Sequence, residues 1–164
     1  MAFRLQPNGQ ARNRSCMTNP TAAPSPALPT RDWSSSYPMT RAAARLARLH
    51  TRRRLTSWQW QGDIDDAVLV VSELVANAAR HGKVAGHHLW LRLAVAEDGG
   101  LIVDVSDPNP AFPGFGSRAA AAGASLGEDG RGLLVVRELA HEVGWFLRPE
   151  QGKTVRARIP RADA

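Results

Sequence analysis

The sequence predicts an α+β domain, a two-layer α/β sandwich with helices on one face of a mixed, mostly antiparallel sheet. Three segments carry apolar residues at helical spacing, and four others have the alternation or composition of strands. Their order is helix, helix, strand, strand, long connection, helix, strand, strand. This order favours helices and strands sorted into two layers.

Length and composition limit the classes of protein to consider. With 164 residues, 43% of them hydrophobic and 22% charged, the chain fits one globular domain with a tail. No apolar run approaches the roughly 18 residues of a bilayer span, and the first residues lack the apolar stretch of a signal peptide. Because Cys16 is the only cysteine, a disulfide framework and a cysteine-based zinc site are excluded. We therefore expect a cytoplasmic protein that does not contact a membrane.

Positive charge is concentrated in the first third of the chain. Residues 1–56 hold ten arginines and one acid, for a net charge of +9, whereas residues 57–164 have a net charge of −3. Five prolines and few large apolar residues predict a disordered basic tail over 1–32, followed by a folded domain over 33–161 and a short tail over 162–164. Nucleic-acid binding through the arginine-rich region is the less favoured hypothesis for function, because the remainder of the chain is acidic.

The first elements expected are a strand and an amphipathic helix. Residues 31–38 suit a short edge strand that Pro38 ends. Residues 39 to about 58 follow a helical pattern, in which an arginine face is either solvated or a surface for a partner protein or nucleic acid. The predicted apolar face comprises Ala42, Leu46, Leu49 and Leu55, and the arginine face comprises Arg41, Arg45, Arg48 and Arg52.

A second helix and a hairpin follow. Asp63 suits the N-terminus of the helix, and Gly82 suits its end. The turn E-D-G-G then joins two strands into an antiparallel hairpin. The buried face of the first strand is predicted to hold Leu89, Leu91, Leu93 and Val95.

The rest of the domain is predicted to hold a lid, a helix and a second hairpin. Residues 108–130, with three prolines and five glycines, form a long connection that we interpret as a lid over a functional site. Gly130, Arg131 and Gly132 then open a helix, where free N–H groups favour anions. Two strands joined by the turn P-E-Q-G complete the domain, and Trp90 and Trp145 are interpreted as sheet-packing residues.

Three carboxylate and amide side chains are candidate site residues. Glu73 and Asn77 lie four residues apart on one helix face, where they offer a proton acceptor and an oxygen ligand for a hard cation such as Mg²⁺. Asp107 shares a strand face with apolar residues, so it should point toward the packed side of the sheet and can accept a hydrogen bond from a ligand amino group. The alternatives are an exposed glutamate with a helix-interior asparagine, and a turn aspartate before Pro108.

Taken in order, four motifs resemble the GHKL superfamily of ATP-binding domains. They are V-S-E-L-V-A-N-A-A-R-H-G, V-D-V-S-D, E-D-G-R-G-L-L-V-V and G-K-T-V-R-A-R-I-P. Within that superfamily the chain is most similar to the small bacterial anti-sigma-factor serine/threonine kinases. The resemblance covers residues 33–161 and implies a Bergerat-type ATP-binding fold.

The resemblance also implies roles for individual residues. Glu73 matches the general base, Asn77 the Mg²⁺ ligand and Asp107 the carboxylate that recognises the adenine amino group. Residues 108–130 match the ATP lid. The second glycine box, whose backbone contacts phosphates, matches Gly130, Arg131, Gly132 and Leu133. The implied cofactors are ATP and Mg²⁺.

The chain departs from the family pattern at two points. The first glycine box reads D-P-N-P where D-x-G is common, so Pro108 and Pro110 stiffen the adenine side of the lid. In the last strand, alternation turns Val155, Ala157 and Ile159 inward and therefore Thr154 outward. The adenine-contacting role of the family threonine is therefore not assigned to Thr154.

The resulting hypothesis is an ATP-binding regulatory protein that phosphorylates a serine or threonine on a partner. By resemblance, the partner is an anti-sigma-factor antagonist, a sigma factor is a competing client, and a homodimer is plausible. The alternative is a catalytically inactive module that binds ATP and a protein partner.

Overall fold

The computed structural model describes residues 31–111 and 128–162. Most of the predicted tail and residues 112–127 of the predicted lid lie outside the described residues. Eight elements follow one another: β1 (Arg31–Pro38), α1 (Arg41–Ser57), α2 (Ile64–His81), β2 (His88–Val95), β3 (Leu101–Asp107), α3 (Glu128–Leu139), β4 (Glu142–Leu147) and β5 (Lys153–Ile159).

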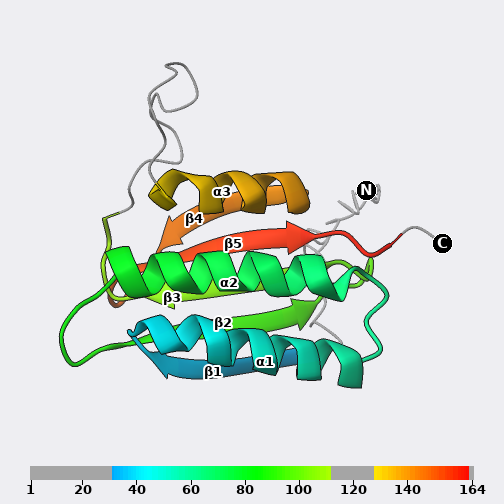
Figure 1. Cartoon of the computed structure of the whole chain (residues 1–164), viewed down its shortest axis with the longest axis horizontal. Helices are drawn as coiled ribbons and strands as arrows, with labels where there is room; N and C mark the ends of the chain where they lie inside the picture. The colour runs from blue at the N-terminus through cyan, green and yellow to red at the C-terminus, as the bar shows by residue number, and fades with distance from the viewer. Residues whose placement is uncertain (1–30, 112–127, 163–164) are drawn as a thin grey trace, which may run out of the picture.

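The five strands form one sheet in the order β1-β2-β3-β5-β4. All four pairings are antiparallel, where the sequence predicted a mixed, mostly antiparallel sheet. Figure 1 shows α1, α2 and α3 side by side on one face of this sheet. The predicted two-layer α+β sandwich is therefore confirmed, as are the edge strand at residues 31–38 and the hairpin of β2 and β3.

The core lies between α2 and the helix-facing side of the sheet. Alternate residues of the central strands are buried there, and α2 contributes a wide apolar stripe against them. Burying one such leucine or valine contributes about 1.5–3 kcal/mol, so this layer dominates the stability of the domain. Its members with less than 2% exposure include Leu89, Leu91, Leu93, Leu101, Val103, Val105, Val70, Val71 and Val75.

The ends of α2 follow the predicted signals. The Asp63 side chain accepts hydrogen bonds from the backbone N–H groups of Asp65 and Asp66 at 2.9 and 3.0 Å. These bonds satisfy donors that the first helical turn leaves unpaired. Gly82 follows the last turn, and its N–H donates to the carbonyl of Ala78.

The predicted apolar face of α1 is wrong for three of its four residues. Ala42 is exposed, Leu46 and Leu49 are each 44% exposed, and Leu55 alone is buried. The buried stripe instead runs Ala43, Ala47, Thr51, Leu55. Three of these four side chains are small, and Leu55 is the one large apolar side chain that α1 buries.

None of the three described helices lies on the opposite side of the sheet, where a row of charged side chains crosses the strands. Asp32 on β1 accepts from Arg92 on β2, and Arg92 also donates to Asp104 on β3 at 3.3 Å. Asp104, 6% exposed, accepts from Arg156 on β5 at 2.7 and 2.8 Å. The hydrogen bonds to Asp104 raise the pKa of the Arg156 guanidinium, which lies 5.3 Å from the Phe146 ring centroid on β4. This ladder joins all five strands.

None of the three described helices has both the length and the apolar character that a bilayer span requires.

Removing the centre of the ladder should destabilise the fold. We expect Asp104→Ala to lower the free energy of unfolding by about 1–3 kcal/mol, because two arginines lose a shared, buried acceptor. The control is Asp65→Ala, which removes an 80% exposed partner of Arg52 and should cost less than about 1 kcal/mol. Equilibrium urea unfolding measures both, and equal losses would contradict a central role for Asp104.

Candidate functional site

Helix α2 presents Glu73 toward the start of α3. A Cβ placed on Gly132 would lie 2.3 Å from Glu73 Oε2, so the carboxylate occupies the space that any larger side chain at position 132 would need. Gly132 is buried, whereas Glu73 is half-buried. The structure therefore disagrees with the alternative interpretation, in which Glu73 is exposed to solvent.

One turn further along α2 lies Asn77, also half-buried. Its Nδ2 atom is buried and has no hydrogen-bond partner among the described residues. An unpaired buried donor costs about 1–3 kcal/mol, a cost that a ligand with an acceptor oxygen would remove. The Asn77 carbonyl oxygen is at the same time a suitable ligand for Mg²⁺. This donor set fits a cation bound together with phosphate oxygens.

Asp107 lies beside the C-terminal end of α2 and points to the packed side of the sheet, as the alternation of β3 predicts. Its side chain is 2% exposed, and its Oδ1 accepts hydrogen bonds from Lys153 Nζ and from the backbone N–H of Asn109, both at 2.9 Å. A Cβ on Gly82 would lie 2.3 Å from the carboxyl carbon of Asp107. The carboxylate is thus enclosed between the end of α2 and the start of β5.

Asn109 and Lys153 extend this contact into a polar network that joins three elements. Lys153 Nζ donates to the Asn109 carbonyl at 2.9 Å, and Asn109 Nδ2 donates to the carbonyl of His81, the last residue of α2, at 3.0 Å. Sequence reasoning missed both residues. The alternation that turns Val155 inward also turns Lys153 inward, so the signal for the lysine was present.

Thr154 lies on the open face of the sheet, as predicted. Its hydroxyl shares a hydrogen bond of 2.7 Å with that of Ser106 on β3, and it is 5% exposed. It points away from Glu73, Asn77 and Asp107, so no role in this site is assigned to it.

The predicted second glycine box lies inside α3, near its start. The helix begins at Glu128, two residues before Gly130. Arg131 is exposed, and Leu133 is partly buried against the hydrophobic core. Within this box, Gly132 is the residue that the structure brings against Glu73.

Helix α2 sets the length of the candidate site. At about 1.5 Å per residue, Glu73 and Gly82 lie about 13–14 Å apart along the helix axis, and Asn77 lies between them. Glu73, in the middle of α2, adjoins Gly132, and Gly82, directly after the last residue of α2, adjoins Asp107. The arrangement suits an elongated ligand with phosphates near Glu73 and Asn77 and an amino-bearing ring near Asp107.

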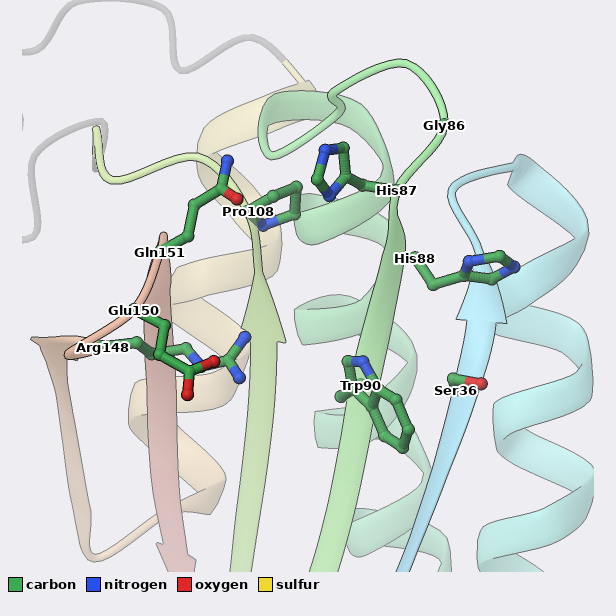
Figure 2. A pocket seen from close by; sticks show the side chains of 9 residues that line it. All are labelled: Ser36, Gly86, His87, His88, Trp90, Pro108, Arg148, Glu150 and Gln151. Carbon is green, nitrogen blue, oxygen red and sulfur yellow. The ribbon is translucent and has the colours of Figure 1, made fainter.

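A cavity of about 310 Å³ lies on the open face of the sheet, away from Glu73 and Asn77. Figure 2 shows Trp90 of β2, 48% exposed, beside Ser36 of β1, with Arg148 and Glu150 contributed by the turn between β4 and β5. Trp90 is therefore less packed than the sequence predicted. Residues 31–111 and 128–162 hold no cluster of three potential metal-ligating His, Cys, Asp or Glu side chains, in this cavity or elsewhere.

Comparison with known proteins identifies a family. Residues 37–159 match the family model described as a histidine kinase-like ATPase domain. A structure of the RsbU and RsbW domains of Rv1364c from Mycobacterium tuberculosis is similar to 83% of the chain, with 23% identity and a TM-score of 0.60, and the chain spans 34% of that structure.

A second similar structure is the histidine kinase domain of the blue-light activated histidine kinase from Erythrobacter litoralis EL346. It shares 24% identity over 60% of this chain and 45% of its own, with a TM-score of 0.44. No curated protein matches the chain.

The close approach at Gly82 should be sensitive to a single methyl group. We expect Gly82→Ala to lower the free energy of unfolding by about 1–3 kcal/mol, because the new Cβ meets the enclosed Asp107 carboxyl group. Gly144→Ala on β4 is the control, because a Cβ there meets nothing within 4 Å, and we expect a change within about 0.5 kcal/mol. Thermal and urea unfolding test both, and a neutral Gly82→Ala would show that Asp107 is not enclosed.

Proposed function

The chain belongs to the histidine kinase-like ATPase domain family, and from that premise we propose that it binds ATP and transfers the γ-phosphoryl group to a partner protein. The acceptor is a serine or threonine hydroxyl, and the partner is an antagonist of anti-sigma factors, with a sigma factor as a competing client. The observation that carries the proposal is the pairing of Glu73 with Gly132 beside the unpartnered Nδ2 of Asn77.

In this proposal, Glu73 acts as the general base. It accepts the proton of the attacking hydroxyl while the hydroxyl oxygen bonds to the γ-phosphorus and the bond to the ADP oxygen breaks. Gly132 leaves room for the carboxylate and limits where it lies. A fixed base of this kind contributes about 10²–10⁴-fold to a rate.

Asn77 and Asp107 hold the two ends of the nucleotide. The Asn77 carbonyl oxygen would hold Mg²⁺, which when bound offsets charge on the phosphates, and Nδ2 would donate to a phosphate oxygen. Asp107 Oδ2, which carries no hydrogen bond among the described residues, would accept from the adenine amino group. Catalysis then comes mainly from positioning and electrostatics.

Asn77→Ala should separate nucleotide binding from stability. We expect the affinity for ATP with Mg²⁺ to fall at least tenfold, because a cation ligand and a phosphate donor are lost. The free energy of unfolding should stay equal or rise, because the variant removes a buried donor that has no partner and adds a residue of high helix propensity. Calorimetric titration with and without Mg²⁺, together with urea unfolding, tests this. Unchanged affinity would remove Asn77 from the site.

Glu73→Gln should abolish transfer without abolishing binding. We expect single-turnover transfer from labelled ATP to a cognate antagonist, or to water, to fall at least 100-fold, with ATP affinity changed less than about threefold. Gly132→Ala should slow transfer through displacement of the carboxylate. Glu97→Gln, at an exposed position after β2, is the control and should retain full activity.

The same assay distinguishes the alternative function. If the wild-type chain binds ATP but neither hydrolyses it nor transfers phosphate to candidate antagonists, the kinase proposal fails. The chain would then be a module that binds ATP and a protein partner without catalysis.

A further inference from the structure

Lys153 and Asp107 form an ion pair in which both side chains are almost completely buried. The lysine side chain is 3% exposed and the aspartate 2%, and Nζ lies 2.9 Å from Oδ1. Removing two charges from water costs several kcal/mol for each ion, and one charge left alone at this depth costs more. The lysine therefore supplies the buried carboxyl group of Asp107 with a cation partner at Oδ1.

The two oxygens of Asp107 have different roles. Oδ1 accepts from Lys153 Nζ and from the Asn109 N–H, which uses both of its lone pairs. Oδ2 has no hydrogen bond within residues 31–111 and 128–162. With Oδ1 saturated and the group ionised, Oδ2 is an acceptor only.

We propose that Lys153 is a positioning residue that sets base selectivity, by holding Asp107 as an acceptor-only carboxylate that takes a 6-amino purine and rejects a 6-oxo purine. The inference rests on the proposed nucleotide site and adds a residue to it. An amino group at purine position 6 donates to Oδ2. A carbonyl at that position faces Oδ2 with a second acceptor, and both then lose their hydrogen bonds to water without replacement.

Loss of the lysine charge should change the selectivity as well as the affinity. A buried carboxyl group without a nearby cation favours its protonated form, and a protonated carboxyl group has an O–H donor. That donor can serve a 6-oxo purine. A merely structural lysine would weaken both nucleotides alike and leave their ratio unchanged.

The test compares ATP with inosine triphosphate, which carries an oxo group at position 6, on the full chain with Mg²⁺ by calorimetry. We expect the wild type to prefer ATP by about 100-fold, the size of discrimination that a mismatched buried polar group produces. Lys153→Met should reduce the preference to below about fivefold, and Lys153→Arg should keep most of it. Lys83→Met, at an exposed position after α2, is the control and should match the wild type.

Thermal unfolding of each variant accompanies the titrations. If Lys153→Met does not fold, Lys153→Gln keeps a donor to Asp107 without the charge and should lower the preference at least tenfold. A folded Lys153→Met or Lys153→Gln that keeps the wild-type preference would overturn the inference while leaving the nucleotide site in place. A wild type that binds neither nucleotide would overturn the proposed function, and with it this inference.

Discussion

One buried ion pair, between Lys153 and Asp107, links the end of β3 to the start of β5 beside the C-terminal end of α2. Apolar side chains fill the space between helices and sheet over most of its length, and this pair replaces them at the rim. Because neither charge can lose its partner cheaply, the start of β5 is tied to the end of β3. Asn109 extends the tie to the last carbonyl of α2. The position of Asp107 relative to Glu73 thus depends on α2 and on this network together.

The two faces of the sheet have different roles. The helix-facing side supplies the apolar burial and, at its margins, the polar groups of the candidate site. The open side carries the ladder from Asp32 to Phe146, which links all five strands by charge and ring contacts. A strand displaced by one residue would turn its ladder member into the core, so the ladder also helps to fix strand register.

Local patterns in the sequence were sufficient for much of this architecture. Period-two alternation located β2 and β3, Asp63 and Gly82 marked the ends of α2, and helical spacing placed Glu73 and Asn77 on one face. The buried face of α1 was not predictable in this way, because its buried stripe includes Ala43 and Ala47 while larger apolar side chains of the same helix stay exposed. The Lys153–Asp107 pair lay on a predicted face, but its partners are 46 residues apart, and only the β3–β5 register brings them together.

The Lys153–Asp107 pair constrains the order in which the two residues can be substituted. If Asp107 is replaced first, the ammonium group of Lys153 stays buried after losing its carboxylate partner. If Lys153 is replaced first, the carboxyl group of Asp107 stays buried without this cation. Each intermediate bears a cost of the order of 3–5 kcal/mol, a large part of the stability of a domain this size. A change at position 107 or 153 alone is therefore expected to be tolerated only where the partner residue or a neighbouring group compensates for the lost contact.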